Sequence, residues 1–463
     1  MIMKNRSWKR RDVLKAGSLI ALAAPLAGLP FKNKDGGLPI SLPQDARFKK
    51  PARPVTAVVL GAGSRGNVYA SYSQKYPDEL KIVGVAEPIE YRRKKFSALY
   101  QIPSKYQWVT WEHALEIPKF ADALIITTPD NLHYGPAMGG LGLGYDLLLE
   151  KVIAQTWDQC SDILKAAKKN NRIVAVCHVL RYTPYFRKLK EVMDSGALGD
   201  IVSLQHFEPV EHIHMSHSFV RGNWRNSKES NPMILSKSCH DLDILRWTIG
   251  KPCRRISSFG SLTLFKAENA PSGATRRCTD GCKVEADCPF SALKIYLRRK
   301  EWLGHLLIED QKDESILKAL KEGPYGRCVY HCDNDVVDHQ VANIEFEGEI
   351  TAAFSMEAFT SYAGRRTRIM GTKGDVVGDM TTLALYDFKT RTQTVWDASK
   401  APESQSGHGG GDFGLAHDFI QAVSQKDASL LTSTIEASME SHLMGFKAEE
   451  SRLSGKTVDV RMG

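Results

Sequence analysis

The sequence predicts an α/β protein whose N-terminal part is a doubly wound parallel sheet and whose C-terminal part is a second α/β domain. Two observations lead to this fold class. A β-branched apolar stretch at 55–60 runs directly into a glycine-rich turn, and short apolar stretches then alternate with segments of helical periodicity as far as residue 176. The chain of 463 residues is also long enough for two domains.

The glycine-rich turn reads Gly61-Ala62-Gly63-Ser64-Arg65-Gly66, and residues 67–74 after it can form a helix. In such a turn the first glycine permits the bend, the second lets the backbone approach a pyrophosphate, and the third allows close helix packing. Glu87 ends the next apolar stretch, at the spacing of an acid that binds the adenosine ribose. The pattern predicts binding of NAD in preference to NADP, by Gly61, Gly63, Ser64, Arg65, Gly66 and Glu87. Arg92 and Arg93 are the competing feature for NADP, and a glycine-rich turn without a ligand is the other alternative.

Three further strand-like stretches end in polar residues. The stretch 123–127 is followed by Thr128–His133, the stretch 145–149 by Glu150-Lys151, and the stretch 172–176 by His178. Carboxyl ends of parallel strands lie at one edge of a sheet, where ligands bind in this fold class. We expect these residues to lie at the same edge as the glycine-rich turn.

The N-terminus has the pattern of an export signal. Arg10-Arg11 precede an apolar stretch, 16–29, that is too short to cross a bilayer as a helix. Residues 1–30 are therefore interpreted as a twin-arginine-type signal, and residues 31–54 as a linker. These assignments predict a periplasmic protein with no stable membrane span after processing. The alternative is a basic and apolar N-terminus that arose by chance.

The net charge of +9 does not indicate a nucleic-acid-binding protein. Residues 1–50 contain 11 basic and 3 acidic side chains, a net charge of +8, so the rest of the chain carries +1. A surface for phosphate backbones needs a clustered excess of basic side chains. We expect no nucleic-acid partner.

Motifs along most of the chain resemble those of a known family. They are GAGSRG at 61–66, TTPDNLH at 127–133, EKV at 150–152, HVLRYTP at 178–184, SCHDLDIL at 238–245 and RIMGTKG at 368–374. In this order, the chain from Val55 to the C-terminus resembles the glucose–fructose oxidoreductase, inositol dehydrogenase and rhizopine-catabolism (Gfo/Idh/MocA) superfamily. The resemblance implies a Rossmann domain at 55–180 and, at 181–463, an α/β domain with a large open, mainly antiparallel sheet. One face of that sheet would cover the nicotinamide and carry the substrate site, and an open sheet also suits a homo-oligomer.

The resemblance also implies which residues form the site, with two departures. Val152 replaces the usual proline, which should alter the backbone more than the chemistry, and Ser236, followed by Lys237, stands where an aspartate is usual. Because the inositol-dehydrogenase arrangement of Lys, Asp and His is therefore incomplete, the resemblance alone does not predict oxidation of a simple polyol. Residues expected to contact the cofactor are Thr128, Asn131, His133, Glu150, Lys151 and His178, and those expected to contact the substrate are Tyr182, Trp224, Arg225 and Asp243.

The chemistry of an alcohol dehydrogenation assigns roles to some of these residues. Hydride removal from a secondary alcohol needs a base for the hydroxyl proton. Lys151, at a buried strand end beside the cofactor, is the expected base, with a lowered pKa. His240 is expected to relay the proton, and Asp243 to orient that histidine or to bind a sugar hydroxyl. The alternatives are a surface lysine and a histidine packed at a helix N-terminus. A glycine-rich loop, 408–412, is expected to close over the site.

Histidines and cysteines raise the question of a metal. The spacing His212-x-His214-x2-His217 can hold zinc, but no partnering carboxylate is evident, and neighbouring histidines also suit sugar hydroxyls. Trp224 and Arg225, later in the same segment, are interpreted as walls for a sugar ring, and a packed hairpin is the alternative. Nine cysteines are present, and Cys160 and Cys177 are expected to be buried thiols. Two clusters, Cys278-x3-Cys282-x5-Cys288 and Cys328-x3-Cys332, lie in an insertion at about 260–333. They could form disulfides, a zinc site or unpaired thiols that staple a loop-rich segment, and we assign no metal because the spacings match no standard finger.

These interpretations together predict an NAD-dependent oxidoreductase that acts on a secondary hydroxyl of a sugar or glycoside and keeps its cofactor tightly bound. A small carbohydrate is the expected substrate. One alternative is an NAD-dependent glycosidase, in which transient oxidation at C3 makes the neighbouring proton acidic and the glycosidic bond is then eliminated. A second alternative is a carbohydrate-binding protein without catalytic activity.

Overall fold

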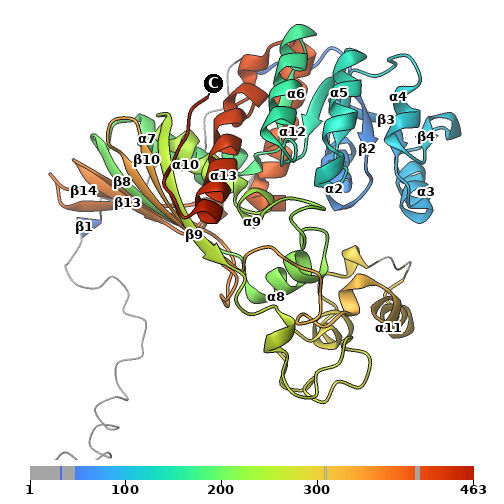
Figure 1. The fold of residues 1–463 in the computed structure, drawn as a ribbon. Helices are drawn as coiled ribbons and strands as arrows, with labels where there is room; N and C mark the ends of the chain where they lie inside the picture. The colour runs from blue at the N-terminus through green and yellow to red at the C-terminus, as the bar shows by residue number, and fades with distance from the viewer. Residues whose placement is uncertain (1–31, 34–46, 307, 309, 402–406, 463) are drawn as a thin grey trace, which may run out of the picture.

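The computed structural model describes residues 32–33, 47–306, 308, 310–401 and 407–462. The signal interpreted at residues 1–30 and most of the linker lie outside these residues. The described chain forms a six-stranded and a ten-stranded sheet, with helices packed between and around them (Figure 1). This arrangement confirms the predicted fold class. Among the described helices, none combines the length and the apolar character needed to cross a membrane.

The six-stranded sheet is the Rossmann half. Its strands are all parallel and have the order β4-β3-β2-β5-β6-β7. Helices cover both faces, which explains why strands such as β5 consist only of buried apolar residues. The order reverses between β2 and β5, so a ligand crevice is expected at their carboxyl ends. The strands are β2 (Val55–Leu60), β3 (Leu80–Ala86), β4 (Gln107–Trp108), β5 (Ala123–Ile126), β6 (Asp146–Leu149) and β7 (Val174–Val176).

The helices of this half follow local signals in the sequence. In α6 the hydroxyl of Thr156 caps the N-terminus by accepting from the N–H of Gln159 (3.2 Å), and Cys160, Ile163 and Ala167 form its buried face. The connecting helices are α2 (Ser64–Lys75), α3 (Glu90–Leu99), α4 (Trp111–Leu115), α5 (Tyr134–Gly142) and α6 (Trp157–Lys169).

Two helices from the far end of the chain also pack on the Rossmann half. Helix α12 (Gly411–Gln425) places Leu415 and Phe419 in the same core cluster as Val55. Helix α13 (Ile435–Ser454) places Met439 against the other face of the sheet and also packs on the second sheet. Figure 1 shows α13 between the two sheets. The C-terminal helices therefore join the two halves into one body of shared cores.

The ten-stranded sheet forms the C-terminal half and is mostly antiparallel. Its order is β1-β15-β14-β13-β12-β8-β11-β10-β9-β16, and only the pairs β8–β11 and β1–β15 are parallel. Helices α7 (Pro184–Asp194), α10 (Cys239–Ile249) and α13 lie on one face. The strands are β1 (Lys32–Asn33), β8 (Ile201–Pro209), β9 (Cys253–Ser261), β10 (His339–Phe346), β11 (Thr351–Glu357), β12 (Arg366–Gly371), β13 (Gly374–Gly378), β14 (Thr382–Asp387), β15 (Thr392–Asp397) and β16 (Val458–Asp459).

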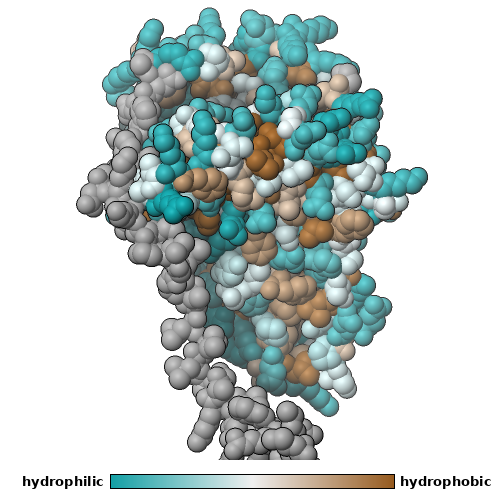
Figure 2. All heavy atoms as spheres, turned by 90° about the vertical axis from the view of Figure 1, so that its left-hand side faces the viewer, coloured by the Kyte–Doolittle hydropathy of each residue, from teal (hydrophilic) through white to brown (hydrophobic). Residues whose placement is uncertain are grey.

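The other face of this sheet carries exposed apolar side chains. Burial alternates along the strands, as in β10, because every second residue points away from the helices. Val202, Phe259, Val341 and Val395 are each at least 40% exposed. Figure 2 looks at the molecule from the side of this sheet and shows hydrophobic side chains scattered among hydrophilic ones. The predicted homo-oligomer stays a prediction.

The insertion between β9 and β10 forms a separate lobe beside α8 (His212–His214) in Figure 1. It contains α11 (Asp313–Glu322) and has its own small core, which includes Ile295, Tyr296 and Ile316. Residues 215–221 form a π-helix, η5, so the packed hairpin proposed for this segment is wrong. The insertion packs against this helical segment, which leads to Trp224.

Candidate active site

The glycine-rich turn has the shape that a dinucleotide requires. Gly61 has φ +99°, and a Cβ there would lie 2.6 Å from the carbonyl oxygen of Thr127. A Cβ at Gly66 would lie 2.1 Å from the carbonyl oxygen of Gly61, so this position also needs glycine. At Gly63 the nearest atom is a guanidinium nitrogen of Arg92 at 4.0 Å, which leaves the backbone open on that side. The open backbone at the N-terminus of α2 fits a pyrophosphate group.

Glu87 lies at the carboxyl end of β3 and faces this turn. One carboxylate oxygen accepts from the N–H of Ala62 (2.8 Å) and the other from the N–H of Ile89 (3.0 Å). The side chain is buried, so these bonds fix its position beside the turn. Each oxygen keeps a further lone pair, which suits ribose hydroxyls better than a phosphate.

Arg65 links the glycine-rich turn to two other segments. Its Nε donates to Glu150 (2.6 Å) at the end of β6, and its Nη2 donates to Asp412 (2.7 Å) at the start of α12. Although burial acts in the opposite direction, His408 and Arg65 lower the pKa of Asp412 to about 2. The charges of Arg65 and Lys151 likewise outweigh burial and lower the pKa of Glu150. The loop at 408–412 thus lies against the turn, as expected, and Arg65 holds the loop in place through Asp412.

The segment after β5 is shaped by His133. One ring nitrogen lies 2.5 Å from the carbonyl oxygen of Val152 and the other 3.0 Å from that of Thr128, and the ring is buried. The Lys151–Val152 peptide bond is cis. His133 was expected to contact the cofactor, but both of its nitrogens are used to hold the two loops together. Asn131 is exposed and Thr128 is partly exposed, so these two side chains remain available to a ligand.

Lys151 projects from the end of β6 towards the C-terminal half. Its Nζ donates to the carbonyl oxygen of Ser236 (2.6 Å) and lies 5.5 Å from the centre of the Trp224 ring. The indole N–H of Trp224 in turn donates to Asp130 (3.1 Å), a residue of the segment after β5. The backbone at the departing position 236 therefore contacts Lys151 directly. Trp224 lies beside Lys151, and its expected contact with the substrate stays a prediction.

His240 lies in the first turn of α10 beside His178, with ring centres 6.0 Å apart. Its Nδ1 is buried without a hydrogen-bond partner among the described residues. Burial and the nearby charge of Lys151 lower the pKa of His240 well below its usual value. Burial also lowers the pKa of His178 to about 3, and neither of its nitrogens has a hydrogen-bond partner in the described chain. Two neutral imidazoles therefore lie together next to Lys151.

Three residues expected to contact the substrate have other partners. Tyr182 is buried and its hydroxyl bonds with Ser433 (2.9 Å). Asp243 is buried and forms a bidentate ion pair with Arg181 (2.6 and 2.7 Å). The nearest histidine to it is His178, at 3.5 Å, so Asp243 does not orient His240. Arg225 pairs with Asp333 of the insertion (2.8 and 2.9 Å) and with Glu229 (2.8 Å). These positions correct the sequence-based assignment, because each polar group is saturated by the protein.

A buried charge network lies on the other side of α10. Asp241 accepts from Arg365 (2.7 Å) and lies 3.0 Å from a nitrogen of His206. Glu208 pairs with Arg365 (2.9 Å) and with Lys237 (3.0 Å). Arg365 lowers the pKa of Asp241 despite its burial. Lys237, which follows the departing position 236, is therefore held in an ion pair with Glu208.

Sequence reasoning missed several residues that shape this site. His442 of α13 accepts from the N–H of Ile153 (3.1 Å) with one nitrogen and bonds the carbonyl oxygen of Ser438 (3.0 Å) with the other. This pattern fixes a neutral tautomer, and burial lowers its pKa to about 4. No local signal identifies His442, because its partner lies 289 positions away. Asp130 lies inside the motif at 127–133 and Arg365 three residues before the motif at 368–374, and these positions were the signal available for them.

Comparison with known proteins agrees with this architecture. The model of the oxidoreductase family, NAD-binding Rossmann fold (GFO_IDH_MocA), matches residues 55–178, and that of the oxidoreductase family, C-terminal alpha/beta domain, matches residues 190–460. The protein YteT of Bacillus subtilis (strain 168) is 23% identical over 369 residues, which cover 75% of this chain and 83% of YteT. Inositol 2-dehydrogenase 2 of Saccharopolyspora erythraea is 27% identical over 132 residues, which cover 28% of this chain and 35% of that protein.

Solved structures show the same fold. An inositol dehydrogenase homolog from Azotobacter vinelandii, complexed with NAD+, has a TM-score of 0.65 and 15% identity, and covers 90% of this chain and 100% of its own. Levoglucosan dehydrogenase, in complex with NADH and L-sorbose, has a TM-score of 0.66 and 17% identity, and covers 89% and 100%. The two family matches span most of the chain. The chain therefore belongs to the Gfo/Idh/MocA oxidoreductase family, and its N-terminal domain is an NAD-binding Rossmann domain.

Proposed function

We propose that this oxidoreductase acts on a secondary hydroxyl of a sugar or glycoside, with Lys151 and His240 handling the hydroxyl proton. The observation that carries the proposal is the buried, unpartnered Nδ1 of His240 beside Lys151 at the carboxyl edge of the Rossmann sheet. In a protein interior such an atom indicates a ligand or a catalytic role. Two relatives support the substrate class, since one solved structure is complexed with NADH and myo-inositol and another with NADH and L-sorbose.

The cofactor, when bound, accepts the hydride from the substrate carbon. The residues of this chain would then supply the proton transfer. Lys151 is anchored by the carbonyl of Ser236 and by the face of Trp224, so its ammonium group is held at the edge where a substrate hydroxyl can approach. His240 is neutral at neutral pH because burial and Lys151 lower its pKa, and a neutral imidazole can accept a proton. The Trp224 ring supplies an apolar wall for a sugar ring.

Retention of the cofactor and export are further parts of the proposal. The ion pair between Arg65 and Asp412 ties the loop at 408–412 to the glycine-rich turn, which supports slow cofactor exchange. An exported enzyme would need such retention, because a free NAD pool is not expected outside the cytoplasm. The twin-arginine route permits it, since that route carries folded proteins. The buried Glu87 carboxylate supports a preference for NAD over NADP. Titration of cofactor-free protein should show tighter binding of NAD, and tighter binding of NADP would contradict this part.

The most direct test is a mass spectrum of the denatured purified protein, in which we expect released NAD(H). Sugars and glycosides are then offered to the enzyme with an external electron acceptor. Net oxidation with acceptor turnover supports the proposal. Cleavage of a glycoside without net formation of NADH would instead identify a redox-neutral glycosidase, and binding without any turnover would identify a carbohydrate-binding protein.

A further inference from the structure

Cysteines that are far apart in the sequence meet in the insertion. An isolated antiparallel pair joins Arg277 and Arg327. Around it, the N–H of Cys278 donates to the carbonyl of Gly326 (2.9 Å) and the N–H of Cys328 to that of Arg276 (2.9 Å). Since successive residues of a strand point to opposite faces, Cys278 and Cys328 lie on the same face of this pair.

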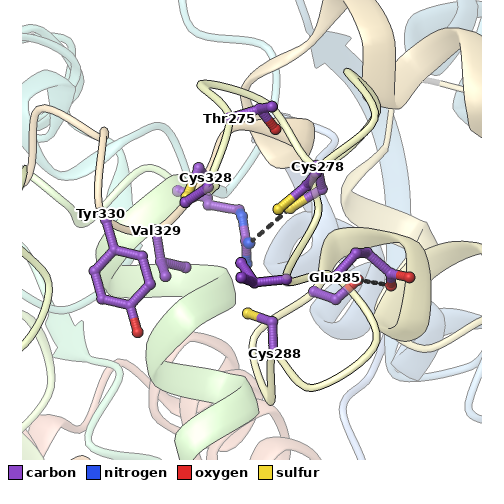
Figure 3. A pocket seen from close by; sticks show the side chains of 12 residues that line it. Thr275, Cys278, Glu285, Cys288, Cys328, Val329 and Tyr330 are labelled. Atoms are coloured by element: carbon purple, nitrogen blue, oxygen red, sulfur yellow. Dashed lines mark hydrogen bonds between the residues drawn. The ribbon is translucent and has the colours of Figure 1, made fainter. Parts of the chain in front are cut away.

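Four thiols line a single cavity, which Figure 3 shows from close by. They belong to Cys278, Cys282, Cys288 and Cys328. The cavity volume of about 20 Å³ is enough for one water-sized group. Cys332 is not among the lining residues, and its thiol donates to the carbonyl oxygen of Cys328 (3.3 Å). The cavity therefore has room for a single ion, and four cysteines are among the residues that line it.

Arg221 brings a positive charge to the same cavity. Its side chain is buried and its Nη2 lies 3.8 Å from the sulfur of Cys278. Its other bonds go to the carbonyl oxygens of Arg327 and Phe290, and its Nη1 has no hydrogen-bond partner among the described residues. No carboxylate in the described chain forms an ion pair with it, although burial of an unpaired charge is costly. A negative charge is therefore needed beside Arg221.

We propose that Cys278, Cys282, Cys288 and Cys328 bind one zinc ion as thiolates. Four sulfur ligands in a tetrahedron are typical of structural zinc. Binding would release the four thiol protons, and the resulting centre, with one Zn²⁺ and four thiolates, carries a net charge of −2 that compensates Arg221. As the side chains stand, no three ligating groups in the described part of the chain are arranged to hold an ion. Closure around zinc therefore requires rotation of the cysteine side chains into the cavity.

The position of this centre gives it a structural role. Arg221 ends helix η5 (Met215–Arg221), and the chain then reaches Trp224 beside Lys151 after three residues. The ion would join the two cysteine segments of the insertion and, through Arg221, fix the segment that carries the wall of the active site. The zinc is thus proposed to hold the insertion, with no part in proton transfer.

The test is metal analysis of the full chain produced in medium that contains zinc and iron, together with a count of alkylated thiols. We expect about one zinc per chain in the wild type, and less than about a tenth of that in Cys278→Ser and in Cys328→Ser. Cys253→Ser is the matched control, because Cys253 is also buried but lies in β9 outside the cavity, and it should keep its zinc.

The wild type alone can also overturn the proposal if the serine variants fail to fold. Removal of zinc by a strong chelator should then expose four additional thiols to alkylation. Wild-type protein without zinc, or with disulfides at these cysteines, would contradict a metal site. Iron together with acid-labile sulfide would instead show an iron–sulfur cluster and contradict the assignment to zinc.

Discussion

Helix α10 separates two sets of buried titratable groups, which differ in how their polar atoms are satisfied. On the side of Asp241, every carboxylate has a cationic partner, through Arg365, Lys237 and His206. On the side of His240, one nitrogen of that ring and both nitrogens of His178 have no hydrogen-bond partner in the described chain. The members of the two sets that lie on α10, His240 and Asp241, are neighbouring residues in the sequence.

We interpret the paired groups around Asp241 as structural and the unpaired nitrogens around His240 as functional. A buried network of paired charges holds the helix against the sheet, although Oε2 of Glu208 has only an ion-pair contact there, and removal of one member leaves an uncompensated buried charge. Buried polar atoms without partners are rare in folded proteins, and each calls for an explanation such as a catalytic role, a bound ion or a water molecule. The contrast therefore predicts that changes on the Asp241 side reduce stability, whereas changes on the His240 side reduce turnover.

The largest expected effect is on the Asp241 side. Arg365→Met leaves the buried carboxylates of Asp241 and Glu208 without their shared partner, and the free energy of unfolding should fall by about 3 kcal/mol or more. Urea denaturation measures this change. Arg255→Met is the control, because that side chain is 57% exposed in its pair with Glu345, and it should cost less than about 1 kcal/mol. Equal costs for the two variants would contradict the contrast.

The second prediction concerns Lys151 on the catalytic side. Lys151→Met keeps the length of the side chain and removes the amino group proposed to handle the hydroxyl proton, so turnover should fall by a factor of about 10² or more. NAD should remain bound, because the turn at 61–66 is untouched, and steady-state kinetics with cofactor analysis measures both properties. Lys237→Met should reduce stability and retain most of the turnover, because Lys237 pairs with Glu208. If Lys151→Met keeps near-normal rates and Lys237→Met is inactive, the role of the base must be assigned to Lys237 instead of Lys151.

The third prediction concerns the pH dependence of stability. Burial lowers the pKa of His178 to about 3 and that of His442 to about 4, whereas both rings titrate near 6.5 in the unfolded chain. Between pH 4 and 6.5 the unfolded chain therefore binds more protons, so stability rises with pH by about 1.4 kcal/mol per unit for each ring. His178→Asn should remove one such contribution. Urea denaturation at pH 5 and pH 6 measures the slope, and an unchanged slope would show that His178 is not held neutral.

The smallest effect is expected at Arg225. Its partner Asp333 is half exposed, so Arg225→Ala should cost less than about 1 kcal/mol of stability. The KM for the sugar should stay within about a factor of two, because Nε and Nη2 of the guanidinium are bonded to Asp333. Trp224→Ala is the comparison and should raise KM clearly. A large change in KM for Arg225→Ala would restore its role as a substrate contact.

The Rossmann half was predictable because its signals are local. Strands buried on both faces leave continuous apolar stretches, and the turn at 61–66 needs glycine for reasons of space that any such turn shares. The same holds for Lys151, which follows a strand end and lies where the parallel sheet places it. The export signal at 1–30 stays a prediction, since those residues lie outside the described chain.

Assignments that depended on distant partners were less successful. Tyr182, Asp243 and His133 occupy recognised motifs, yet their polar atoms are taken up by Ser433, by Arg181 and by two backbone carbonyls. A motif shows that a residue type is suited to a site. It does not show which other groups will saturate that residue, because those groups are tens to hundreds of positions away.

Local patterns in the sequence predict the fold class, the family resemblance and the edge of the sheet where the cofactor is expected to bind, because periodicity, glycine positions and strand ends are properties of neighbouring residues. The packing of distant elements places Asp241 in a charge network and leaves Nδ1 of the neighbouring His240 without a partner in the described chain. It also decided that Cys328 joins three cysteines of the other cluster at one cavity. These decisions rest on packing between elements far apart in the chain, which the order of residues encodes only through the complete fold.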